Sequence, residues 1–169
     1  YGVAFLAPVV QKNISYNNNN IPKIYNMVMN CRPEKNFKRP YLAKKVDNLA
    51  YIKGYIFKKD DIYDYTELNA KYVNENRLNV DEVINIYNKS FCGGIFSATE
   101  GACYSSSEYL LCGLPVISTM SKGGRSFWYN KNNSIIIEPS DDDVNNAVNV
   151  CIYNIKNNIF NSENIRNNQ

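Results

Sequence analysis

The sequence predicts an α/β domain with a doubly wound parallel sheet, Rossmann-like in its organisation and covered by helices on both faces. Short apolar runs alternate along the chain with segments whose apolar residues recur at helical spacing. The apolar runs are continuous rather than alternating with polar residues, which is typical of strands buried on both faces. A length of 169 residues and an apolar fraction of 44% suit one globular domain.

The first half of the chain contains three expected strands. IYNMVMN (24–30) and LAYIKGYIF (49–57) are apolar runs, and KYVNENRLNV (71–80) holds a short strand and a turn. We expect a helix at 41–48, after two prolines, and another at 60–70. The second begins with acidic residues, which suit the N-terminal end of a helix dipole.

From residue 81 onward helices and strands alternate regularly. DEVINIYNKS (81–90) predicts an amphipathic helix, because Val83, Ile86 and Tyr87 share one face. Asp81 is its expected cap. The remaining expected elements are a strand at 92–97, a helix at 103–112 ended by Gly113, strands at 115–119 and 134–139 with a loop between them, and a long helix at 141–158.

Composition excludes several classes of site. Histidine is absent, so this chain supplies no histidine base and no HExxH metal site. Five cysteines without a CxxC pair argue against a disulfide framework or a zinc knuckle, and they favour a reducing, cytoplasmic compartment. No apolar run reaches the roughly 20 residues of a membrane span, and no signal-peptide pattern is present.

The stretch ATEGACYSSSEYLLCGLPVIST (98–119) concentrates the chemistry. Glu100 follows an expected strand and precedes an expected helix, at the carboxyl edge of the sheet where ligands of such folds bind. Gly101 permits a tight turn, and free N–H groups near 102–104 would open the helix as an anion site, suited to phosphate. Glu108 follows about 2.2 turns later, and its carboxylate can accept hydrogen bonds from ribose hydroxyls. These features match a nucleoside diphosphate that carries a sugar.

EGACYSSSEYLLCGLPVIST resembles the Glu-x7-Glu signature of retaining GT-B glycosyltransferases, especially the family-4 type. The flanking segments resemble the same domain in the same order. NMVMNCRPEKNFKRPYLA is similar to its first strand and phosphate loop, VDEVINIYNKSFCGGIFSATEG to the helix and strand before the signature, and SKGGRSFWYNKNNSIIIEPSDDDVNNAV to the loop and strand after it. The resemblance covers 24–147. It implies the C-terminal half of a GT-B enzyme: a nucleotide-sugar-binding domain at 21–169, an interdomain tail or linker at 1–20, and an N-terminal acceptor domain outside this chain.

The resemblance also implies residue roles. Glu100 would lie beside the transferred sugar as the catalytic carboxylate, and Glu108 would bind the ribose hydroxyls. Arg32 and either Lys35 or Lys38 would neutralise the leaving diphosphate. The other donor-binding candidates are the turn Gly101, Ala102, Cys103 and Tyr104, with Asn79 and Val80 near the base, and Gly124, which either faces the sugar or only turns its loop. Many family members have glycine where Cys103 stands, and cysteine resists a positive φ.

The implied function is retaining transfer of a sugar from a nucleotide-diphosphate sugar, such as a UDP- or GDP-sugar. The isolated domain would bind the donor but transfer poorly or not at all. No metal and no other cofactor would be needed, because basic side chains and the helix N-terminus would stabilise the diphosphate. The partner would be the N-terminal domain of the full-length protein. Nucleic acid is not expected, and membrane association is left open.

Two other functions stay open. A non-catalytic nucleotide-sugar-binding module would have the same sequence in this half. A receiver-like or purely structural α/β domain is less favoured, because no strand end offers the aspartate that a receiver needs. At some positions a structural role is favoured over a functional one. The acidic runs 60–61 and 141–143 open expected helices as caps rather than metal ligands, and the serines 105–107 only occupy the early helix. Trp128 and Tyr129 are assigned to the core rather than to an acceptor platform.

Overall fold

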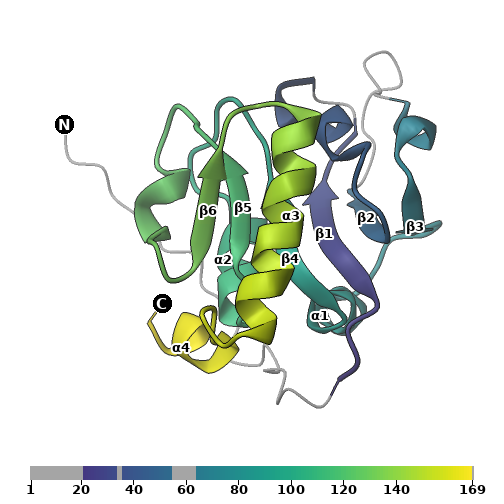
Figure 1. The fold of residues 1–169 in the computed structure, drawn as a ribbon. Helices are drawn as coiled ribbons and strands as arrows, with labels where there is room; N and C mark the ends of the chain where they lie inside the picture. The colour runs from purple at the N-terminus through teal and green to yellow at the C-terminus, as the bar shows by residue number, and fades with distance from the viewer. Residues whose placement is uncertain (1–20, 34–35, 55–63, 169) are drawn as a thin grey trace.

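The computed structural model describes residues 21–33, 36–54 and 64–168. A six-stranded sheet with the order β3-β2-β1-β4-β5-β6 forms its centre, and every neighbouring pair of strands is parallel (Figure 1). The strands are β1 (Tyr25–Cys31), β2 (Leu49–Lys53), β3 (Ala70–Val73), β4 (Ser90–Ile95), β5 (Val116–Thr119) and β6 (Ser134–Ile137). The order reverses between β1 and β4, so the predicted doubly wound, Rossmann-like fold is confirmed.

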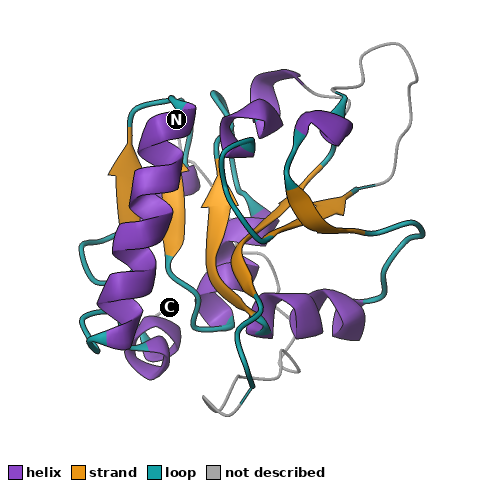
Figure 2. Ribbon diagram, turned by 45° about the vertical axis from the view of Figure 1, so that its right-hand side comes forward, coloured by secondary structure: helices purple, strands orange, loops and turns teal. Residues whose placement is uncertain are grey.

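Helices cover both faces of this sheet. The long helix α3 (Asp141–Lys156) crosses one face, and α1 (Val80–Asn88) and α2 (Tyr104–Leu111) lie on the other (Figures 1 and 2). A short helix that the sequence did not predict, α4 (Ser162–Asn167), packs beside α2. None of the described helices has both the length and the apolar character needed to cross a bilayer.

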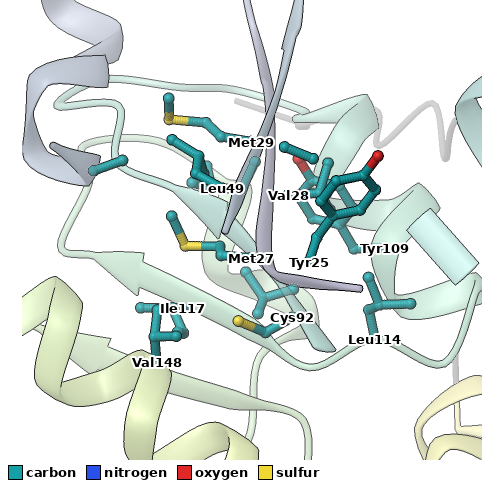
Figure 3. Packing of buried hydrophobic residues seen from close by; sticks show 14 of the residues in the cluster. Tyr25, Met27, Val28, Met29, Leu49, Cys92, Tyr109, Leu114, Ile117 and Val148 are labelled. Carbon is teal, nitrogen blue, oxygen red and sulfur yellow. The ribbon is translucent and has the colours of Figure 1, made fainter. Parts of the chain in front are cut away.

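The core explains why the strands read as continuous apolar runs. Met27, Val28 and Met29 are consecutive in β1, and all three are buried (Figure 3). Successive side chains of a strand point to opposite faces, so β1 is covered from both sides. Because both faces of the strand are buried, apolar residues occupy successive positions, and the sequence does not alternate between apolar and polar residues.

Two expected helices are wrong. Residues 41–48 form only the 3-10 turn η2 (Pro40–Ala43), because the chain turns again and Asn48 adopts a positive φ of 51° before β2 begins. Within the described part of 60–70 there is only the 3-10 turn η3 (Tyr65–Glu67), capped by Asp64. Acidic residues thus cap a single turn rather than a helix.

Other boundaries shift by a few residues. Helix α1 begins at Val80, and Asn79 rather than Asp81 is its cap: Asn79 accepts from the amide of Glu82, and Glu82 accepts from that of Asn79, a complete capping box. The acidic run 141–143 does open the long helix α3, as expected, but it occupies the first turn; the cap itself is Ser140, which accepts from the Asp143 amide. Residues 60–61 and the linker 1–20 lie outside the described residues.

Candidate functional site

A pocket of about 280 Å³ opens at the carboxyl ends of β1 and β4. One wall consists of the end of β1 and the 3-10 turn η1 (Asn36–Lys38), and the other consists of the loop after β4 and the start of α2. Among the predicted site residues, the pocket brings together Arg32, Lys38, Glu100, Ala102, Cys103 and Tyr104. Lys35 lies outside the described residues.

The pocket contains an ion pair. The Lys38 ammonium donates to Glu100 Oε2 at 2.5 Å, and the two side chains are only 17% and 16% exposed. Arg32 lies on the same wall, next to Gly54, where a Cβ would lie 2.5 Å from the Arg32 Cγ. Gly54 therefore leaves the space that the Arg32 side chain occupies.

The N-terminus of α2 opens on the pocket. Cys103 is the N-cap residue, with a φ of −100°, and its side chain makes no capping hydrogen bond. The adjacent Ala102, Tyr104 and Ser105 line the pocket. The first amides of α2 have no partner inside the helix, so they offer N–H donors to an anion there. Cysteine fits where many members of the resembling family have glycine, because the position needs no positive φ.

Gly101 does not have the role expected from the sequence. A Cβ at Gly101 would meet no atom within 4 Å, and its φ is not in the positive region. The tight position lies instead at Gly123, which has a φ of +120° and where a Cβ would be 2.1 Å from the Glu100 carbonyl oxygen. Gly124, with a φ of −90°, begins the turn η4 (Arg125–Trp128) and does not line the pocket.

The loop that carries Glu100 is paired with the loop after β5. Thr99 forms a parallel bridge with Lys122. The Glu100 amide donates to the Lys122 carbonyl at 3.0 Å, and the Lys122 amide donates to the Ala98 carbonyl at 3.0 Å. Two loops that follow neighbouring strands therefore fix the backbone at Glu100, while Lys38 holds its carboxylate.

Two arginines that the sequence analysis did not assign hold these strand ends together. Buried Arg125 donates to the carbonyls of Ser97 at 2.9 Å and Thr119 at 2.6 Å, and burial lowers the pKa of its guanidinium. Arg39 donates to the Phe96 carbonyl at 2.6 Å and to the Thr119 hydroxyl at 2.8 Å. Nothing in the local sequence distinguishes them from solvated arginines, because their partners are backbone carbonyls and a threonine hydroxyl that only the folded chain brings to them.

A second pocket of about 910 Å³ adjoins the first. Asn30 and Gly54 line both pockets, and the second extends between the end of β2 and the start of α1, past Ile52 and Leu78. Asn79 and Val80 do not line it, although the residues just before them do. The Asn79 side chain is used by the capping box. The expected base contact of Asn79 and Val80 therefore has no support from their positions.

Glu108 lies outside the linings of both pockets but is connected to their junction. Its Oε2 accepts from the Tyr87 hydroxyl at 2.8 Å, and that hydroxyl accepts from the Asn30 side-chain amide at 2.6 Å. The neighbouring serines contribute more than was expected. Ser105 donates to the Asn30 carbonyl at 3.1 Å, and the Ser106 hydroxyl lies 2.7 Å from that of Tyr129.

Three further features bear on the site: the aromatic residues at η4, the thiols of the pocket and the potential metal ligands. Tyr129 packs against the core, but Trp128 is 41% exposed, so its assignment to the core is wrong. Burial raises the pKa of Cys31 to about 12 and also raises that of Cys103. Both sulfurs are protonated thiols near neutral pH and are poor nucleophiles. Among the described residues no three potential metal-ligating side chains gather.

The chain matches no family model and no curated protein sequence. Solved structures do share its fold. HepE from Anabaena, in complex with UDP-glucose, matches with a TM-score of 0.68 at 16% identity, over 84% of this chain and 43% of HepE. Sucrose-phosphate synthase from Thermosynechococcus elongatus matches with a TM-score of 0.68 at 16% identity, over 88% of this chain and 41% of the synthase.

A third structure is a single domain. The C-terminal domain of the group 1 glycosyl transferase LpcC from Francisella tularensis matches with a TM-score of 0.63 at 15% identity, over 88% of this chain and 85% of that domain. This chain thus spans less than half of HepE and of the synthase, but most of the LpcC domain. Likeness at these identities shows the fold. The chain has the Rossmann-like fold of the GT-B glycosyltransferases, and it matches the part that LpcC presents as a C-terminal domain.

Proposed function

We propose that this chain is the donor-binding domain of a GT-B glycosyltransferase. It binds a nucleotide-diphosphate sugar, and an acceptor held by an N-terminal domain outside this chain receives the sugar with retention of its anomeric configuration. The observation that carries the proposal is one pocket lined by Arg32, Lys38, Glu100 and the open end of α2. The complexes of HepE with UDP and UDP-glucose support a nucleotide-sugar ligand for this fold.

The diphosphate binds where positive charge collects in this pocket. Arg32 and Lys38 supply cationic side chains, and the first amides of α2 supply N–H donors and the positive end of a helix dipole. As the bond between sugar and phosphate breaks, negative charge grows on the departing diphosphate. Donors fixed in advance stabilise that charge most strongly in the transition state.

Lys38 also connects the diphosphate to the sugar. Its ammonium binds the Glu100 carboxylate. A diphosphate competes for the same ammonium, so donor binding frees part of the Glu100 carboxylate. A carboxylate that is only 16% exposed needs a new partner when it loses an old one. A hydroxyl group of the sugar is that partner, which places Glu100 beside the reacting carbon.

The nucleoside extends into the second pocket. The two pockets meet at Asn30 and Gly54, so a molecule longer than a diphosphate passes that junction. The base lies beside Ile52 and Leu78, whose apolar side chains suit an aromatic ring. The ribose lies at the junction, and Glu108 accepts hydrogen bonds from its hydroxyls.

Calorimetric titration with UDP-, GDP- and ADP-sugars tests the binding part of this proposal. We expect one of these ligands to bind, and Glu108→Ala to weaken it at least about tenfold, the loss typical of a charged hydrogen bond. Glu163→Ala, on the exposed first turn of α4, is the matched control. If no nucleotide sugar binds, or if Glu108→Ala leaves the affinity unchanged, the assignment fails.

A non-catalytic binding module would behave identically in that titration. The two are separated by the activity of a longer protein that includes the acceptor domain. Glu100→Gln in that protein should lower transfer far more than donor affinity if this half belongs to an enzyme. Glu163→Gln is again the control. A longer protein that binds the donor but transfers nothing would favour the binding module.

A further inference from the structure

Two buried tyrosines from different helices meet at Asn30. Tyr87 of α1 and Tyr109 of α2 are both fully buried, with ring centroids 4.8 Å apart and planes at 74°. The Tyr109 hydroxyl accepts from the backbone amide of Asn30 at 2.8 Å, and the Tyr87 hydroxyl accepts from the Asn30 side chain at 2.6 Å. The end of β1 is thereby fixed to both helices, at the junction of the two pockets.

The Tyr87 hydroxyl has one proton, and its surroundings determine where that proton points. Because the oxygen accepts from Asn30, its proton is directed to Glu108 Oε2, 2.8 Å away. Burial raises the pKa of Tyr87 well above its ordinary value, so the hydroxyl stays protonated. Among the described residues nothing donates to the other oxygen of Glu108, and the side chain is half-buried.

We propose that Tyr87 is a positioning residue for the nucleotide ribose: its hydroxyl holds one oxygen of Glu108 so that the other is presented to the ribose hydroxyls. This inference rests on the proposed function. Tyr87 does not touch the ligand and acts only through Glu108. A half-buried glutamate has several rotamers, and a fixed donor on one oxygen restricts them before the nucleotide arrives.

A plain structural role is the competing explanation, because any buried tyrosine hydroxyl needs partners. The two explanations differ in what they predict for ligands without ribose hydroxyls. A structural defect weakens binding of every nucleotide alike. A defect in presenting Glu108 weakens only those ligands whose ribose hydroxyls Glu108 would hold.

The test compares Tyr87→Phe with the wild-type chain. The ligands are whichever of UDP, GDP and ADP binds tightest and its 2′-deoxy and 3′-deoxy counterparts. In the wild type, we expect removal of a bound hydroxyl to weaken binding about tenfold. In Tyr87→Phe the parent nucleotide should bind about fivefold to tenfold more weakly, while the deoxy ligand changes little, so the ratio between them shrinks toward one.

Two further variants keep the result decisive. Tyr25→Phe alters another buried tyrosine, in contact with Tyr72 and outside both pockets, and it should preserve the ratio. Glu108→Gln should by itself lose the discrimination between the parent nucleotide and its deoxy counterpart, and this result does not depend on how well Tyr87→Phe folds.

An unchanged ratio in Tyr87→Phe, or an equal loss for both ligands, would overturn the inference. If the wild type binds no nucleotide, the proposed function fails, and this inference fails with it. If the wild type binds but does not discriminate, only the role of Glu108 and Tyr87 is lost.

Discussion

Gly123 and Glu100 are in backbone contact, so close that a Cβ on Gly123 would lie 2.1 Å from the Glu100 carbonyl oxygen. Gly123 also has a φ of +120°, which side-chain-bearing residues rarely adopt. The loop after β5 can therefore approach the catalytic candidate only because this position has no side chain. The glycine that the sequence singled out, Gly101, is under neither constraint.

Alanine substitution at Gly123 and at Gly101 should affect the stability of the domain very differently. Gly123→Ala combines a strained φ with a backbone clash, so we expect it to lower the free energy of unfolding by about 2 kcal/mol or more and to disturb nucleotide binding. Gly101→Ala, in open space, should change stability by less than about 0.5 kcal/mol. Urea denaturation of both variants measures the difference. Equal stability of the two variants would contradict the close contact.

Lys38 should contribute to nucleotide affinity. Removing its charge with Lys38→Gln takes one cation from the pocket and leaves Glu100 without its partner. We expect the affinity for a nucleoside diphosphate to fall by about tenfold or more at low salt, with a smaller dependence on salt concentration. Lys131→Gln, on an exposed loop before β6, is the matched control. Equal affinities of the two variants would place the diphosphate elsewhere.

Arg125 should act as a structural clamp rather than a ligand contact. Its guanidinium donates to carbonyls at the ends of β4 and β5, which no shorter or single-headed group can do simultaneously. Arg125→Met removes both hydrogen bonds, although the Thr119 carbonyl keeps the one from the Ser118 hydroxyl, and should lower the free energy of unfolding by about 2–4 kcal/mol. Arg125→Lys should lose less, because one bond can be kept. Thermal or urea unfolding orders the three proteins, and the reverse order would refute the clamp.

Lys23 should make stability depend on pH. Burial lowers the pKa of its ammonium from 10.5 to about 8, while the ammonium donates to the Asn88 carbonyl at 2.8 Å. Between about pH 8 and 10.5 the unfolded chain binds more protons at this position than the folded chain, so this contribution to stability rises with pH. Below pH 8 both states are protonated and the dependence ends.

The measurement for Lys23 is a difference. The free energy of unfolding of the wild type minus that of Lys23→Met should increase by about 2 kcal/mol between pH 7 and pH 9.5. Taking the difference cancels the buried cysteines and tyrosines that do not interact with Lys23; Cys112 does interact with it. A difference that stays flat, or that falls with pH, would show that Lys23 is solvated in the folded chain.

The sequence predicted the parts of the fold that depend on local patterns of burial. The run around Met27 to Met29 indicated a strand covered from both sides, and Glu100 was placed correctly at the carboxyl edge because it directly follows such a strand. The helix at 41–48 was wrong because composition alone does not reveal that Asn48 takes a positive φ and enters β2 at once.

Contacts between distant segments could not be predicted. Ser105 has the appearance of an ordinary first-turn residue until β1 brings the Asn30 carbonyl to its hydroxyl. The cap of α1 differs from expectation for a local reason. The sequence favours Asp81, since aspartate is a good cap, but Asn79 completes a reciprocal pair with Glu82 that aspartate at 81 would not form. In each case the deciding partner comes from tertiary geometry or from a competing local hydrogen bond.

The two buried tyrosines at Asn30 also affect how the pocket can respond to a ligand. The Asn30 amide donates to the Tyr109 hydroxyl. A Cβ at Gly93 would lie 2.1 Å from the Tyr109 ring, so the ring packs directly on β4. We expect slow amide exchange at Asn30, because breaking this hydrogen bond displaces a fully buried tyrosine that packs on β4. The part of the pocket around Asn30 is therefore held rigidly, and we expect adaptation to different sugars to occur around the ion pair of Lys38 and Glu100.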